Sequence, residues 1–187
     1  MKALLKSKYH VIIVSLYILF CSYFFFFTEL SRELFTFNIK DLIVVFPMLA
    51  TSLSTFFVVN YFLKFGAVGL NKRNLSKLPI IILYASLLIA VPEEILFRGV
   101  IQTYLYSVFP NVLFSIILSS VIFGFAHILN SSRGFSPIKW NWKLVAVTFL
   151  AGIFLGLSFY VTTSLVVPVI LHVLFILIMK VFIKDTM

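Results

Sequence analysis

The chain has 187 residues, of which 62% are apolar and 11% charged, whereas a soluble domain is about 45–50% apolar and about 25% charged. This composition excludes a soluble globular protein. The net charge of +9 does not indicate nucleic-acid binding, because the basic residues fall in short segments between long apolar runs. We therefore expect an all-α fold, a polytopic transmembrane helical bundle that forms a single membrane domain over residues 1–187.

Six apolar runs predict about six transmembrane helices. A helix needs about 20 apolar residues to cross about 30 Å of hydrocarbon, and in lipid its backbone must satisfy its own hydrogen bonds. The runs are separated by turn-forming or basic segments, among them the basic segment 65–77 and the pair Pro110-Asn111. In chain order the predicted spans are roughly 9–27, 42–63, 78–109, 112–130, 144–162 and 164–179.

The basic residues predict the orientation of these spans. Twelve of the fifteen lie on one side of the six-span arrangement, and the positive-inside rule then places both termini in the cytoplasm. The composition, rich in Phe and Lys, suits a multi-pass protein of a bacterial cell membrane. The twelve are Lys2, Lys6, Lys8, Lys64, Lys72, Arg73, Lys77, Arg133, Lys139, Lys143, Lys180 and Lys184.

Five acidic, basic or histidine residues lie inside the predicted spans between residues 78 and 179. Such residues cost about 2.5–3.5 kcal/mol each on insertion scales, so they persist where they face the protein interior and have partners. A purely structural explanation also exists, in which a buried Glu–Arg pair fixes helix packing and the histidines are ordinary core residues. The five are Glu93, Glu94, Arg98, His127 and His172.

Helical spacing predicts how these residues pair. Glu94 and Arg98 are four residues apart and can share one helix face, where Arg98 would keep Glu94 ionised. Glu93 points about 100° away and needs another partner, for which His127 is the candidate. Pro92 removes one helical hydrogen bond beside the glutamates.

The depth of Glu93 in the bilayer limits this pairing. If residues 78–84 are an interfacial approach and the true span covers 85–108, Glu93 lies about 12 Å deep at 1.5 Å per residue. Under that arrangement we expect the Glu93 carboxylate and the His127 imidazole to lie within about 10 Å of each other.

Three motifs in order resemble a known family. Residues Glu93 to Arg98 fit EExxxR, residues Phe123 to His127 fit FxxxH, and His172 follows in a later span. Together they resemble the CPBP family of CAAX proteases and bacteriocin-processing proteins, also called Abi. The resemblance covers about residues 78–177, the motif-bearing core.

The resemblance implies a membrane-embedded endopeptidase. Glu93 and His127 would activate a water molecule, Glu94 with Arg98 would support that geometry, and His172 would help to bind the oxyanion. Its members are described both as metalloproteases and as glutamate-dependent hydrolases without a metal. Bacterial members are linked to peptide maturation and to bacteriocin self-immunity.

The last motif departs from the family pattern. Members usually carry Asn or Asp four residues after the final histidine, whereas this chain has Ile176. Loss of one oxyanion donor typically slows an acyl-transfer step by about 10²–10³. Asn130, three residues after His127, is a candidate replacement donor.

Alternatives follow from the same residues. The favoured hypothesis is hydrolysis by a glutamate base without a cofactor, and the alternative is a Zn²⁺ ion held by Glu93, His127 and His172. No aspartate lies in any predicted span, which excludes a two-aspartate mechanism.

A non-catalytic immunity or binding protein and a small proton-relaying transporter are further alternatives. The expected partners are a peptide or membrane-protein substrate and the lipid bilayer.

Overall fold

The computed structural model describes residues 19, 23, 34–63, 67–128 and 140–184. The predicted first span, 9–27, lies outside the described residues except for positions 19 and 23, which are helical. The remaining predicted spans each correspond to a helical segment, so the all-α class is confirmed. In chain order the elements are η1 Ile39–Asp41, α3 Leu42–Leu63, β1 Ala67–Val68, α4 Lys72–Leu75, α5 Leu78–Ala85, η2 Ser86–Ala90, α6 Val91–Glu94, η3 Ile95–Gln102, α7 Thr103–Val108, α8 Val112–Ala126, α9 Trp142–Thr162, α10 Val166–Phe182 and β2 Ile183–Lys184.

Five consecutive elements, from α5 to α7, form one continuous helix over Leu78–Val108. Two of its segments, η2 and η3, are π-helical and flank the turn that contains Pro92. Proline has no N–H to donate and its ring crowds the carbonyl one turn earlier, so a wider helix on either side accommodates it. Short π segments occur frequently at functional sites.

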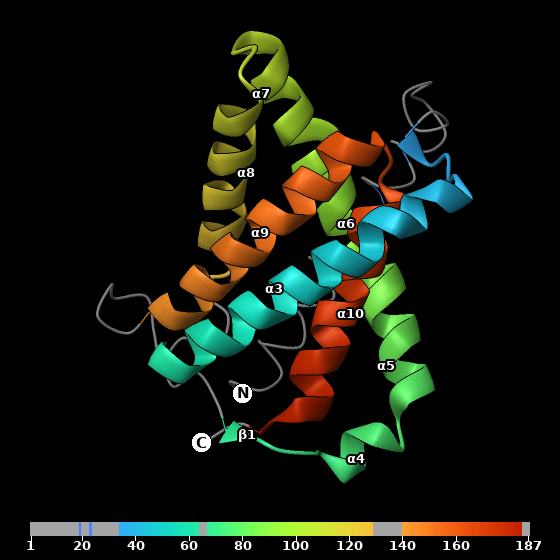
Figure 1. Ribbon diagram of the computed structural model, residues 1–187, viewed down its shortest axis with the longest axis vertical. Helices are drawn as coiled ribbons and strands as arrows, with labels where there is room; N and C mark the ends of the chain where they lie inside the picture. Colours follow the sequence, from blue (N-terminus) through green and yellow to red (C-terminus); the bar gives the residue numbers. More distant parts are fainter. Residues whose placement is uncertain (1–18, 20–22, 24–33, 64–66, 129–139, 185–187) are drawn as a thin grey trace.

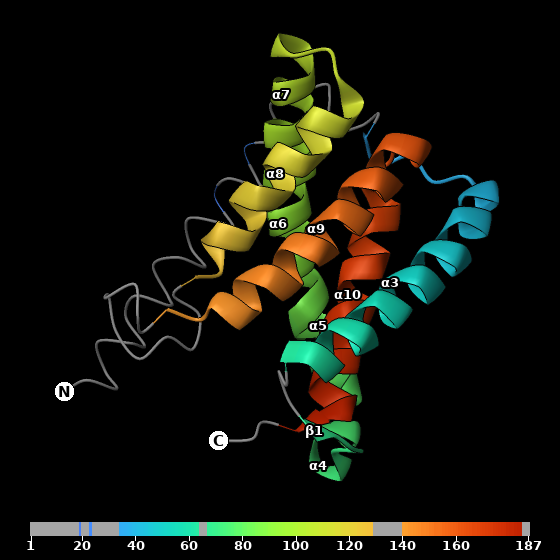
Figure 2. The same cartoon turned by 60° about the vertical axis from the view of Figure 1, so that its left-hand side comes forward.

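α8, α9 and α10 pack against this long helix. α8 returns antiparallel to α7 after a turn at Pro110 and packs along α9, while α3 crosses α10 and runs beside α9 (Figures 1 and 2). The Asn111 side chain accepts a hydrogen bond from Phe114 N at 3.0 Å and so caps the start of α8. The predicted tight turn at residues 110–111 is confirmed.

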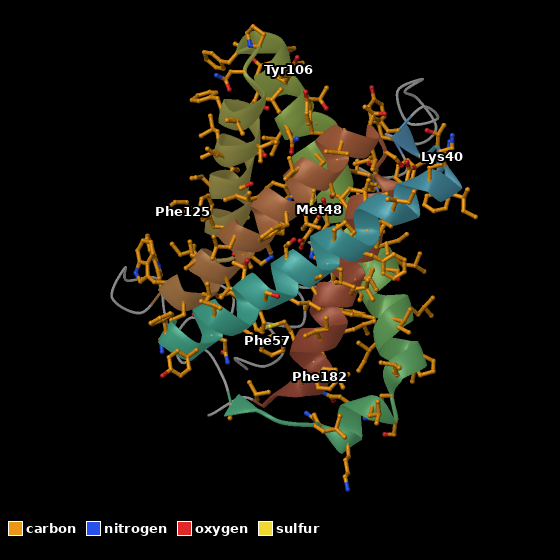
Figure 3. All side chains as sticks on the ribbon, in the orientation of Figure 1. Lys40, Met48, Phe57, Tyr106, Phe125 and Phe182 are labelled. Atoms are coloured by element: carbon orange, nitrogen blue, oxygen red, sulfur yellow. The ribbon has the colours of Figure 1, made fainter. Side chains whose placement is uncertain are left out.

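Among the described residues, three helical segments are long and apolar enough to cross a membrane: Ile39–Phe62, Leu78–Val108 and Trp142–Thr162. α8 and α10 are shorter apolar helices of 15 and 17 residues. Large apolar side chains cover the outer surface, among them Phe57, Tyr106 and Phe125 (Figure 3). A surface of this kind suits contact with lipid, and the protein is a membrane protein; the number of spans and the side of the termini stay predictions.

The segment predicted as a plain basic loop, 65–77, contains regular structure. β1 pairs antiparallel with β2, and Asn74 Nδ2 donates to the Lys180 carbonyl oxygen at 2.7 Å. These contacts join residues more than a hundred positions apart in the chain. Local composition carries no signal for such long-range pairing, so the loop prediction was incomplete.

Close packing of α8 on α9 depends on glycine residues in both helices. A Cβ atom on Gly152 would lie 3.0 Å from Ser120 Cβ, and one on Gly124 would lie 3.0 Å from the Val145 carbonyl oxygen. Glycine at these positions therefore lets the two backbones approach, as small residues do in membrane helix pairs.

Candidate active site

The structure brings together the three residues expected to act on a substrate. Glu93 Oε2 lies 3.7 Å from His127 Nε2 and 3.8 Å from His172 Nε2. The predicted proximity of Glu93 and His127 is therefore confirmed. His172, which was expected at the same site as Glu93 and His127, approaches the same carboxylate oxygen.

Helix length explains why residues from three elements meet at one level. Glu93 lies near the middle of the 31-residue helix Leu78–Val108, while His127 is the residue at which α8 ends. In Figures 1 and 2 the lower end of α8 is level with α6, and α5 continues beyond it. The short α8 thus places His127 beside Glu93 rather than at the far end of the long helix.

His172 is positioned by the turn that precedes α10. Thr163 ends α9 in the left-handed conformation at φ 52°. Leu165 N then donates to the Leu34 carbonyl oxygen at 2.6 Å, and Ser164 Oγ donates to the Thr36 carbonyl oxygen at 2.5 Å. These contacts tie the start of α10 to the segment before α3 and fix the height of His172 against Glu93.

The ring orientation of His127 follows from its hydrogen bond to its own helix. His127 Nδ1 lies 2.8 Å from the Phe123 carbonyl oxygen, which can only accept, so we assign the proton to Nδ1. Phe123 O is one of the last carbonyls of α8, which have no partner within the helix. In the neutral ring Nε2 then carries a lone pair that faces Glu93.

The second histidine is oriented by a carboxylate. His172 Nδ1 lies 2.7 Å from Glu94 Oε1, and an ionised carboxylate only accepts, so Nδ1 donates. Arg98 Nε lies 3.1 Å from Glu94 Oε2 on the opposite side of that carboxylate. Glu94 and Arg98 are completely buried. A buried Arg–Glu–His series therefore holds the ring of His172 with Nε2 directed toward Glu93.

Exposure divides the cluster into two parts. The side chains of Glu93 and His127 are each 15% exposed, whereas those of Glu94 and Arg98 are fully buried. Glu93 Oε2 itself is buried and accepts no hydrogen bond from the described part of the chain. Its distances to the two Nε2 atoms exceed a direct hydrogen bond but suit a bridging water.

The ring of Phe123 contacts four side chains of this site. Its centroid lies 4.9 Å from that of Phe97, 4.7 Å from that of His127 and 5.8 Å from that of His172, all in edge-to-face arrangements. Arg98 Cζ lies 4.7 Å from the same centroid, within the range of a cation–π contact. Phe123 therefore packs against both histidines and the buried arginine and helps to hold all three in place.

Replacement of Phe123 by leucine is expected to destabilise the protein by about 1–3 kcal/mol, because it removes edge-to-face contacts and leaves unfilled volume. The measurement is the free energy of unfolding in mixed micelles. Phe114, an exposed phenylalanine on the same helix whose ring contacts only Phe109 among the described aromatic rings, provides the matched control. Phe114→Leu should lose much less stability than Phe123→Leu, and equal losses for both variants would contradict this role of Phe123.

Several polar residues near the site were not singled out from the sequence. Gln102 and Ser119 are buried, and Ser119 Oγ lies 3.4 Å from Gln102 Oε1. Gln102 lies four residues after Arg98 inside an apolar helix, and this helical spacing is the sequence signal that could have identified it.

Asn130, proposed as a replacement oxyanion donor, lies outside the described residues. Ile176 lies one turn after His172 in α10, where it is partly buried.

The fit of a metal ion can be judged from the donor atoms. Within the described ranges, no group of three His, Cys, Asp or Glu side chains is arranged to hold a metal ion. In each histidine Nδ1 faces another acceptor, Glu94 or a backbone carbonyl, while Nε2 faces Glu93, an orientation that metal-bound histidines also adopt. We derive no step through zinc, and the zinc alternative stays a prediction.

Comparison with protein families agrees with the motifs. The model of the type II CAAX prenyl endopeptidase Rce1-like family matches residues 75–178, a little over half of the chain. The match includes both glutamates, Arg98 and both histidines of the site. The search of curated proteins and the search of solved structures gave no match. The chain belongs to the Rce1-like family of type II CAAX prenyl endopeptidases.

Proposed function

We propose that this protein is an intramembrane endopeptidase in which Glu93 and His127 activate a water molecule that hydrolyses a peptide bond. The family suggests a CAAX-type intramembrane protease activity. The observation that carries the proposal is the approach of two imidazole Nε2 atoms, at 3.7 and 3.8 Å, to one buried carboxylate oxygen of Glu93.

Glu93, His127 and the water molecule account for every bond and proton transfer in the proposed reaction. A water held between Glu93 Oε2 and His127 Nε2 loses a proton to the carboxylate as its oxygen attacks the carbonyl carbon of the scissile bond. The tetrahedral intermediate then collapses, the carbon–nitrogen bond breaks, and the proton passes from Glu93 to the leaving amine. General base catalysis of this kind contributes about 10²–10⁴-fold.

His172 supplies the stabilising charge in this proposal. With Nδ1 donating to Glu94, a protonated ring presents its Nε2–H toward the position of the developing oxyanion. The buried Glu94 carboxylate supports the positive charge on the ring, and Arg98 balances Glu94. Because Ile176 stands where relatives carry a polar residue, His172 has to provide stabilisation that a second donor would otherwise share.

We propose hydrolysis without a metal ion. Incubation of the purified protein with 1,10-phenanthroline, followed by its removal, should leave the cleavage rate unchanged. The control is the non-chelating 1,7-isomer at the same concentration. Loss of cleavage with the chelator alone, restored by added Zn²⁺ and accompanied by stoichiometric zinc in the untreated protein, would establish the zinc alternative at Glu93, His127 and His172.

A second candidate function is non-catalytic. Ile176 replaces a donor whose removal alone costs about 10²–10³ in related chemistry, and this observation favours an immunity or binding protein built on the same fold. Such a protein would sequester a peptide or a membrane protein in the bilayer. It would keep its biological effect after a conservative change at Glu93, whereas a protease would not.

The proposed substrate is a peptide or a membrane protein, and the proposed location is a bacterial cell membrane that the chain crosses several times. The name of the family suggests prenylated peptides as one class of substrate. Leader peptides and bacteriocins are other classes that fit the same chemistry.

The proposal is tested with purified protein in lipid nanodiscs and a peptide library, and new peptide termini are read by mass spectrometry. Wild-type protein should generate termini that a Glu93→Gln preparation does not.

A further inference from the structure

Two hydrogen bonds join the long helix to α9 beyond the buried ion pair. Arg98 Nη2 donates to the Gly152 carbonyl oxygen at 3.0 Å, and Gln102 Nε2 donates to the Gly156 carbonyl oxygen at 3.0 Å. The donors are four residues apart on one helix and the acceptors four apart on the other. The two bonds are therefore successive contacts along one line of the helix interface.

Glycine at position 156 makes the bond from Gln102 geometrically accessible. A Cβ atom on Gly156 would lie 2.8 Å from Gln102 Oε1 and 3.2 Å from Ile116 Cγ2. Carbonyl oxygens within a helix have a second lone pair for an outside donor, but neighbouring side chains normally shield them. Glycine at 156 thus does more than permit close packing, because a side chain there would crowd the Gln102 amide that reaches its carbonyl.

The bond from Gln102 acts at the end of an unusual segment of the long helix. η3 covers Ile95–Gln102 in π form, a rare helix type that frequently occurs at functional sites. Gln102 is the last residue of this segment and is buried. Its bond to Gly156 therefore fixes the rotation of a segment whose other end adjoins Glu94.

A continuous series of contacts leads from α9 to the candidate active site. Gly152 accepts from Arg98, Arg98 lies against Glu94, and Glu94 accepts from His172, whose Nε2 faces Glu93. The position of the long helix against α9 therefore sets the position of both glutamates.

We propose that Gln102 is a positioning residue for peptide hydrolysis, which it supports by locking η3 to the Gly156 carbonyl of α9. It touches neither the substrate nor the reacting atoms. This inference rests on the proposed function, because it concerns the rate of the reaction assigned to Glu93. It predicts a loss of turnover when the bond is removed, even if the helix remains folded.

The test uses full-length protein in nanodiscs and a peptide that the wild type cleaves. Gln102→Met keeps the side-chain size and removes the donor, so kcat should fall about 10-fold to 100-fold with KM unchanged, as expected for a small misplacement of catalytic groups. Ser158→Ala is the matched control, since the Ser158 hydroxyl is buried in α9 but donates only to its own helix, at Leu155 O. That control should keep the wild-type kcat.

A second pair of variants separates positioning from simple destabilisation. Gly156→Ala should lower kcat as Gln102→Met does, because its methyl group displaces the Gln102 amide. In a Gln102→Ala background the displaced amide is gone, so adding Gly156→Ala should change kcat by less than about threefold. Additive losses, in which each change lowers kcat by the same factor with or without the other, would overturn the inference.

The outcomes also separate the two proposals. No cleavage by the wild type, or undiminished cleavage by Glu93→Gln, would remove the proposed function and this inference with it. Cleavage that requires Glu93 but proceeds at the wild-type kcat in Gln102→Met would overturn the positioning role alone. A fall in kcat that only matches a fall in the folded fraction, measured by thermal unfolding, would likewise overturn it.

Discussion

Glu93→Gln is expected to lower the rate of peptide hydrolysis about 10²–10⁴-fold, the contribution of a general base. Glutamine matches glutamate in shape but cannot take a proton from water. The carboxylate oxygen that it replaces lies 3.7 Å from His127 Nε2, so the fold should tolerate the change. The measurement is the single-turnover rate of cleavage with protein of matched folded fraction.

Asp41→Asn is the matched control for this prediction. Asp41 is a carboxylate at the start of α3 whose Oδ2 accepts from Asn38 N at 3.0 Å, away from the site. The control should cleave at the wild-type rate. A Glu93→Gln protein that hydrolyses peptides within a few-fold of the wild type would show that another group is the base.

Arg98→Met is expected to destabilise the protein by about 3–5 kcal/mol, because it leaves the Glu94 carboxylate buried without its counter-charge. Both side chains are fully buried, and the Nε–Oε2 distance is 3.1 Å. The free energy of unfolding in mixed micelles measures the effect. Lys40→Met, which removes an exposed cation at the start of α3, should change it by less than about 0.5 kcal/mol.

The double variant Glu94→Leu/Arg98→Met makes this prediction specific to the ion pair. Removal of both charges should recover much of the stability that Arg98→Met loses, since apolar replacements of a buried pair are often tolerated. The folded double variant should still cleave poorly, because His172 Nδ1 has lost its carboxylate partner. Equal stability of wild type and Arg98→Met would contradict the role assigned to the pair.

The approach of Glu93 to His127 could be predicted because ionisable groups in a membrane span must face the interior and find partners. Similarly, the spacing of Glu94 and Arg98 on a helix fixes their pairing before any tertiary contact is known. In both cases the prediction needed only the sequence order of a few helices and a rule about burial.

The partner of His172 could not be predicted in the same way. Whether its ring meets Glu93, Glu94 or both depends on where α10 begins, and the turn at Thr163 and the contacts of Ser164 and Leu165 with the segment before α3 determine that. The role of Phe123 as a shared contact depends equally on three-dimensional packing.

Gln102 illustrates a different gap. A neutral amide in an apolar helix attracts less attention than a charge, and its partner is a backbone carbonyl that no side-chain pattern reveals. The pairing of β1 with β2 was missed for a related reason, because backbone hydrogen bonds between distant residues leave little trace in local composition.

The most direct test of the central claim compares wild type, Glu93→Gln and His127→Ala at matched levels in membranes of intact cells. Peptide processing and a protective phenotype such as bacteriocin resistance are scored together. Hydrolysis by the Glu93–His127 site predicts that both variants remain folded and lose both processing and protection. Retention of protection by both variants would contradict it and would identify a binding protein on a protease fold.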